Sequence, residues 1–146
     1  MPPPTSEISA AIEIAATPER VWAVLTDLAS YPQWNPVFRE ASGQVAVGNR
    51  ITLTSTQPVT GHTMTVKVKV LTAEPATELR WVSRVLGLMS SKRSFTLSPA
   101  NGGTRLMQTQ TYRGLFTRFP PKTISRIQIS FDAINQAIKE RAEDLR

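Results

Sequence analysis

Cysteine is absent from the 146 residues of this chain, which excludes disulfides, thiolate metal sites and thiol nucleophiles. The single histidine, His62, follows Thr60-Gly61 in a predicted turn. We interpret it as a surface residue, because a catalytic triad or a metal site needs convergent partners. No apolar run approaches the ~20 residues of a membrane-spanning helix. Residues 1–7 lack the basic and apolar regions of a secretory signal, so we expect a cytoplasmic protein. We also expect no metal and no cofactor.

Carboxylates are missing from a long internal stretch. Residues 79–131 contain no Asp or Glu but nine basic residues, namely Arg80, Arg84, Lys92, Arg93, Arg105, Arg113, Arg118, Lys122 and Arg126. With a net charge of +6, one half of the protein should carry positive potential, which favours anionic ligands or acidic surfaces. Alternatively, these residues form solvated strand faces that keep sheet edges soluble. Because they lack the interleaved aromatics of a base-stacking platform, we expect no nucleic-acid partner.

Hydrophobic periodicity divides the chain into elements. Residues 8–14 alternate as a strand with one buried face. Thr17-Pro18-Glu19 then predicts a helix start, with a hydroxyl N-cap, a proline in the first turn and an acid at the positive end of the dipole. That helix ends near Ala29, and at most one helical turn follows in residues 30–36. Further strands are expected at about 38–45, 51–55, 64–70, 79–85, 95–97 and 106–112, with a hairpin turn at Asn101-Gly102-Gly103.

An apolar seam marks the last element. Its members are spaced three and four apart, as on one face of a helix of roughly two dozen residues: Ile124, Ile127, Phe131, Ile134 and Ile138. These elements pack most economically as an α+β helix-grip fold. In this fold a curved antiparallel sheet of six to seven strands wraps around the long C-terminal helix, with two short helices after the first strand. We expect residues 1–6 to be a flexible N-terminus and residues 7–146 to form this single domain.

Four stretches resemble the START/birch-pollen-allergen (SRPBCC) superfamily, in particular its bacterial polyketide cyclase/dehydrase-like members. They are ATPERVW (16–22), LTDLASYPQWNP (25–36), ELRW (78–81) and FDAINQAIK (131–139). Together they span nearly the whole chain after its proline-rich start, although none is specific for a ligand or a reaction. The resemblance implies an apolar tunnel between the helix and the sheet. Members bind lipids, hormones, polyketides or quinones, and a minority catalyse cyclisation or dehydration.

The chain departs from such relatives at two places. They often have His and Glu where this chain has Gln108 and Gln110, and Glu-His where it has Lys92-Arg93. Glutamine does not act as a general acid or base, and arginine does not deprotonate in proteins. These departures favour ligand binding over catalysis.

Polar residues on the predicted concave face are candidate ligand-orienting groups. Gln108, Gln110 and Tyr112 share one face of their strand, and Ser83 lies across the same surface. Two amides and a hydroxyl facing a core are costly unless they are hydrogen bonded. Two interpretations are open. In the first, these side chains form hydrogen bonds with one another or with buried water; in the second, they line a pocket and orient a ligand. Asn135, which flanks the helix seam, favours the second interpretation.

Three further features have more than one interpretation. Trp34 packs where a short helix meets the long one, a junction that is also the cavity mouth in helix-grip folds. Arg93 shares the strand phase of Phe95, so its side chain either points inward and holds an anionic group or snorkels outward to solvent. We favour the outward orientation. The apolar residues 115–121, with basic flanks, form a lid, a membrane-touching loop or a cover over the helix start.

We therefore predict that the protein binds a small hydrophobic or amphiphilic molecule, neutral or anionic, in a cavity between the sheet and the C-terminal helix. Apolar contacts are expected from Trp34, Val68, Trp81, Val85, Phe95, Ile127, Phe131 and Ile134. Orienting contacts are expected from Ser83, Arg93, Gln108, Gln110, Tyr112 and Asn135. The alternative is a polyketide cyclase, aromatase or dehydratase, in which Tyr112 is the candidate acid and Gln110 polarises a carbonyl. The sequence does not determine the oligomeric state.

Overall fold

A computed structural model of the chain describes residues 5–85, 88–114 and 119–144. It contains one antiparallel sheet with the strands β1 (Thr5–Ile14), β2 (Phe38–Ser42), β3 (Arg50–Thr56), β4 (Thr63–Glu74), β5 (Glu78–Val85), β6 (Met89–Ala100) and β7 (Gly103–Gly114). The short helices α1 (Pro18–Thr26), η1 (Leu28–Ser30) and α2 (Tyr31–Trp34) follow β1, and the long helix α3 (Pro121–Asp144) follows β7. The predicted α+β helix-grip fold is confirmed.

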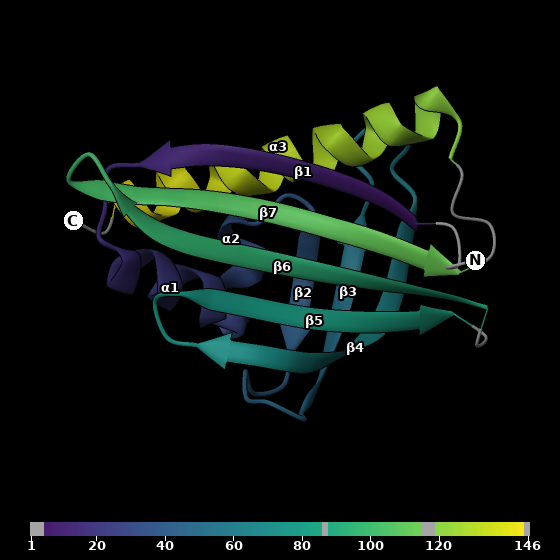
Figure 1. The fold of residues 1–146 in the computed structure, drawn as a ribbon, viewed down its shortest axis with the longest axis horizontal. Helices are drawn as coiled ribbons and strands as arrows, with labels where there is room; N and C mark the ends of the chain where they lie inside the picture. Colours follow the sequence, from purple (N-terminus) through teal and green to yellow (C-terminus); the bar gives the residue numbers. More distant parts are fainter. Residues whose placement is uncertain (1–4, 86–87, 115–118, 145–146) are drawn as a thin grey trace.

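The sheet curls because its strands keep twisting along the order β1-β7-β6-β5-β4-β3-β2. In Figure 1, β1, β7 and β6 run across the view, whereas β2 and β3 run steeply behind them. Helix α3 lies beside β1 in the same view. β1 starts at Thr5, which pairs with Arg113 of β7, so the sheet begins two residues before the expected boundary at residue 7.

Burial follows the predicted alternation of the strands. Leu53 and Val68 face the concave side and are buried, while threonines and lysines occupy the positions on either side of them. The predicted helix start is also confirmed, because Thr17 Oγ1 accepts a hydrogen bond from the backbone N–H of Arg20 at 3.3 Å.

Helix α3 has buried side chains only from Ser130 onward. Phe131, Ile134 and Ile138 are fully buried, but Ile124, which the sequence places on the same seam, is 41 % exposed. The helix packs against β1 and α1, and the side chains it buries there begin at Ser130. The first turns of α3 therefore leave apolar surface exposed, which the periodic seam alone did not predict.

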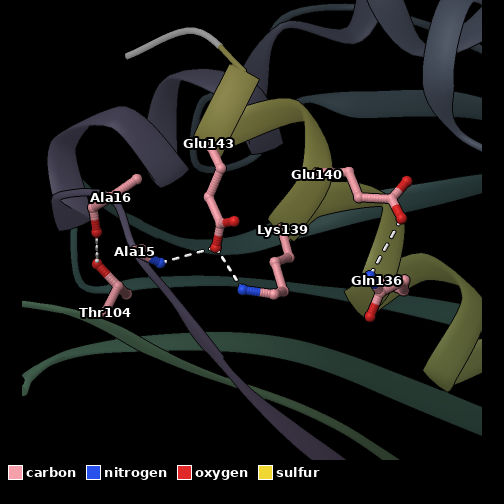
Figure 2. Close-up of polar contacts among 7 residues, drawn as sticks. All are labelled: Ala15, Ala16, Thr104, Gln136, Lys139, Glu140 and Glu143. Carbon is pink, nitrogen blue, oxygen red and sulfur yellow. Dashed lines mark hydrogen bonds and ion pairs between the residues drawn. The ribbon is translucent and has the colours of Figure 1, made fainter.

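Polar contacts fix the C-terminal turns of α3 to the end of β1 (Figure 2). The carboxylate of Glu143 accepts a hydrogen bond from the backbone N–H of Ala15 at 2.9 Å and pairs with Lys139 one turn earlier. Nearby, the buried Thr104 Oγ1 donates to the carbonyl oxygen of Ala16 at 2.7 Å. These contacts hold α3 and β7 against the segment between β1 and α1 at one end of the sheet.

Candidate functional site

A cavity of about 290 Å³ lies on the concave side of the curled sheet. One wall comes from β2, β3 and β4 and is mainly apolar, with Phe38, Leu53, Met64, Val66 and Val68. The other wall comes from β5, β6 and β7 and is mainly polar, with Trp81, Ser83, Ser91, Arg93, Gln110 and Tyr112. Met64 is 51 % exposed, so the cavity opens to solvent beside it. The described part of the lining contains no α3 residue.

Strand register produces the polar wall. Three rows of paired residues cross β5, β6 and β7, namely Leu79–Phe95–Gln108, Trp81–Arg93–Gln110 and Ser83–Ser91–Tyr112. The first row is buried in the core, and the second and third rows line the cavity. Side chains of paired residues stand on the same face of a sheet. The row deep in the core, which is apolar except for Gln108, therefore leads to two rows nearer the open end that are polar except for Trp81.

Arg93 is the central group of the polar wall. Its guanidinium carbon lies 5.0 Å from the ring centroid of Phe38 and 4.7 Å from that of Phe131. Its Nη1 donates a hydrogen bond to Oε1 of Gln108. No carboxylate of the described residues forms an ion pair with it. The interpretation that Arg93 snorkels outward is wrong, because two aromatic rings and a buried amide hold it inside.

Burial shifts the pKa of the ionisable groups around this cation. It lowers the pKa of Arg93 to about 10, and electrostatic interactions with Tyr112 and Tyr31 oppose the shift. The guanidinium therefore stays charged at neutral pH. Burial also raises the pKa of Tyr112, although the positive charge of Arg93 opposes this. The phenol of Tyr112 is consequently protonated at neutral pH.

Gln108 connects the cation to helix α3. Its Nε2 donates to Oδ1 of Asn135 at 2.9 Å and to the carbonyl oxygen of Phe131 at 3.4 Å. Asn135 Nδ2 in turn donates to the carbonyl oxygen of Ala10 on β1 at 3.3 Å. This chain of amides crosses β6, β7, α3 and β1 and fixes the orientation of the Gln108 side chain. The observed contacts of Gln108 and Asn135 are those of core amides whose hydrogen bonds are satisfied within the protein.

Gln110 and Tyr112 differ from Gln108. The buried Oε1 atom of Gln110 has no hydrogen-bond partner among the described residues. The ring of Tyr112 meets the ring of Phe119 edge to face at 4.9 Å between centroids. Both side chains line the cavity, although the Oε1 atom of Gln110 is itself buried.

The structure brings some of the predicted site residues to the cavity and not others. The lining contains Val68, Trp81, Ser83, Arg93, Gln110 and Tyr112. It does not contain Trp34, Phe95, Gln108, Ile127, Phe131, Ile134 or Asn135. Most of these pack in the core behind the lining, Ile127 is half-buried on α3, and Trp34 Nε1 donates to Ser30 Oγ at 3.0 Å. The side chain of Val85 and residues 115–118 of the predicted loop lie outside the described residues.

Sequence reasoning missed several lining residues. Leu53 and Val66 carried a usable signal, because their strands place them on the same face as Val68. Ser91 shares the phase of Arg93 in the same way. Phe38 carried no such signal in the sequence, because its segment is only a weak strand candidate. The position of Phe38 also depends on how far the sheet curls.

The part of the chain that the structure describes forms neither a metal-binding cluster nor a membrane-spanning helix. Among residues 5–85, 88–114 and 119–144, no three His, Asp or Glu side chains gather as a metal ion would require. His62 is exposed in the loop between β3 and β4. In the same part of the chain, no helix has the length and apolar character needed to cross a bilayer.

A curled sheet that grips a long helix and keeps an open cavity on its concave side defines a helix-grip protein. Residues 5–143 match the family described as polyketide cyclase/dehydrase and lipid transport. The chain belongs to this family, as the resemblance of its four stretches implied. No curated protein sequence matches it significantly.

Solved structures share the fold at low sequence identity. A START superfamily protein from Mycobacterium smegmatis is 18% identical, with a TM-score of 0.78 over 96% of this chain and 99% of that one. Ara h 8.0201 is 14% identical, with a TM-score of 0.74 over 97% and 99% of the two chains. The di-domain ARO/CYC StfQ from the steffimycin biosynthetic pathway is 14% identical, with a TM-score of 0.76 over 97% of this chain and 51% of that one. At these identities the likeness concerns the fold.

Proposed function

We propose that this protein binds one small hydrophobic or amphiphilic molecule in the cavity of its sheet. The observation that carries the proposal is a cavity with an apolar wall from β2–β4 facing a polar wall from β5–β7. Such a site buries the apolar part of a ligand and orients it with a few hydrogen bonds. Membership of a family that includes lipid transport supports the same function.

The cavity volume limits the size of the ligand. At about 290 Å³ it lies just below the range of roughly 300–1,000 Å³ that is typical of small-molecule sites. A molecule with one or two rings, or with a single chain of medium length, fits this volume. A lipid with two long acyl chains does not.

The chemistry of the lining favours binding over catalysis. Its described residues include no His, Asp, Glu or Lys, the side chains most often used for proton transfer. The phenol of Tyr112 has its pKa raised by burial, which makes it a weaker acid. A cyclase, aromatase or dehydratase at this site would depend on confinement and on neutral hydrogen-bond donors alone.

A neutral fluorescent probe tests the proposal. We expect N-phenyl-1-naphthylamine to bind the protein, and Ser91→Phe to weaken that binding about tenfold or more by filling the cavity. Ser98→Phe is the matched control, because Ser98 lies on the same strand but is exposed on the opposite face. Equal probe affinity in the two variants would count against the cavity as the binding site.

Native mass spectrometry of freshly purified protein, followed by denaturing extraction, identifies the chemical class of a ligand that stays bound. A defined co-purifying molecule of one or two rings or one chain is the expected result. A co-purifying two-chain lipid would contradict the size limit set by the cavity.

A further inference from the structure

We infer that the ligand carries a single carboxylate, which pairs with the guanidinium of Arg93 inside the cavity. This inference rests on the proposed function and specifies its ligand class. The side chain of Arg93 is held firmly, yet no carboxylate of the described residues neutralises its charge.

Arg93 is positioned by groups that carry no formal negative charge. Its contacts are the Oε1 atom of Gln108 and the ring faces of Phe38 and Phe131. The Gln108 amide is itself held by Asn135, so its oxygen stays directed at the guanidinium. A buried charge without a counter-ion is costly, and an acid from the ligand would offset that cost.

The sequence around Arg93 offers no acid of its own. Residues 79–131 contain no Asp or Glu, and this stretch includes the polar wall of the cavity on β5, β6 and β7. The two ion pairs found among the described residues, Arg80–Glu78 and Lys139–Glu143, do not include Arg93. The positive charge in the cavity is therefore left for a bound molecule to neutralise.

The geometry of the guanidinium favours a planar acid. The rings of Phe38 and Phe131 occupy positions over its carbon, so new hydrogen bonds must come from its edge. An arginine has five N–H donors, and one hydrogen bond is found for Arg93 within the described residues. A carboxylate accepts two parallel hydrogen bonds from such an edge.

The number of charges in the lining limits the charge of the ligand. Arg93 is the one Arg or Lys among the described lining residues, which favours a monoanion over a doubly charged phosphomonoester. Gln110 is paired with Arg93 across β6 and β7, and its buried Oε1 atom has no donor. Because that oxygen is buried, the Gln110 side chain would have to rotate before a hydroxyl or N–H group next to the carboxylate of the ligand could supply the donor.

Two probes of the same shape test the inference by titration calorimetry at neutral pH. We expect the wild-type protein to bind naphthalene-2-carboxylate about tenfold more tightly than naphthalene-2-carboxamide, because a hydrogen-bonded ion pair replaces a neutral contact. Arg93→Gln should remove this preference while the carboxamide still binds. Arg84→Gln removes the same charge from an exposed residue outside this lining and should keep the preference.

A second variant keeps the test independent of how Arg93→Gln folds. Gln110→Glu places a carboxylate opposite Arg93 and breaks no hydrogen bond of the Gln110 oxygen, so it should abolish the preference for the carboxylate probe. Equal binding of both probes to the wild type, or an unchanged preference in both variants, would overturn the inference and leave the proposed function standing. If neither probe binds the wild type, the proposed function fails together with the inference.

Discussion

At the residue scale, two glutamines of the same strand have opposite roles. Gln108 is fully buried and uses both ends of its amide, toward Arg93 and toward Asn135. Gln110 lies two residues later on the same face, lines the cavity, and leaves a buried oxygen without a partner. One amide therefore builds the site, and the other lines the cavity with a buried oxygen that is left unsatisfied.

This difference predicts opposite effects on stability. Gln108→Leu should lower the free energy of unfolding by about 2 kcal/mol or more, because Arg93 loses its acceptor and Asn135 loses its donor. Gln110→Leu should leave it unchanged within about 0.5 kcal/mol or raise it, since a buried unpaired oxygen is removed. Urea unfolding of the two variants measures both values. Equal losses would contradict the separate roles.

Part of the site could be predicted from the sequence, and the reason lies in strand phase. Alternation placed Val68, Trp81, Ser83, Gln110 and Tyr112 on the concave face, which they occupy. Phase does not determine depth along the strand, so it could not separate lining residues from those packed behind them. It also could not place Arg93, whose inward position depends on two aromatic rings from β2 and α3.

At the element scale, the order of strands and helices could be predicted because each has strong local signals. The Thr17 cap, the Asn101-Gly102 turn and the alternating strands correspond to observed elements. The long helix could be predicted from its apolar seam. The exposure of Ile124 at the start of that helix could not be predicted from the seam. Burial along α3 depends on which neighbours it meets, and those are distant in sequence.

One tertiary hydrogen bond links β7 to the segment that enters α1. Thr104 Oγ1 donates to the carbonyl oxygen of Ala16, and Thr104 is fully buried. Thr104→Val keeps the shape but leaves that oxygen without its donor, so the free energy of unfolding should fall by about 1–3 kcal/mol. Thr96→Val, at an exposed position of β6, should change it by less than about 0.5 kcal/mol. Indistinguishable urea midpoints would show that this hydrogen bond does not stabilise the junction.

At the scale of the whole molecule, packing and cavity occupy different ends of the same sheet. The contacts of Glu143 and Thr104 close one end, and the fully buried side chains of α1 and α3 fill it. Toward the other end, the core gives way to the rows that contain Arg93 and Tyr112. The molecule therefore combines a well-packed part that supplies stability with a partly hollow part that is available for binding.

The two tyrosines make the stability of the whole fold depend on alkaline pH. Burial raises the pKa of both Tyr31 and Tyr112 above the ordinary value of 10.0. The unfolded chain therefore loses these phenolic protons at a lower pH than the folded protein does. The stabilisation that results from keeping them protonated is fully present below pH 10 and is lost as the pH rises through their folded-state pKa values.

Tyr31→Phe isolates the larger part of this effect. Tyr31 is buried and its hydroxyl donates to the carbonyl oxygen of Leu25 at 2.5 Å, whereas Tyr112 lines the cavity. The variant should be less stable at neutral pH, because the Leu25 carbonyl loses its donor, and its stability should fall less steeply above pH 10 than that of the wild type. Urea unfolding of both proteins at a series of alkaline pH values gives the two slopes. The lowered pKa of Arg93 acts in the opposite direction in both proteins. Parallel curves above pH 10 would mean that the Tyr31 phenol ionises equally easily in the folded and unfolded chains, contrary to its burial.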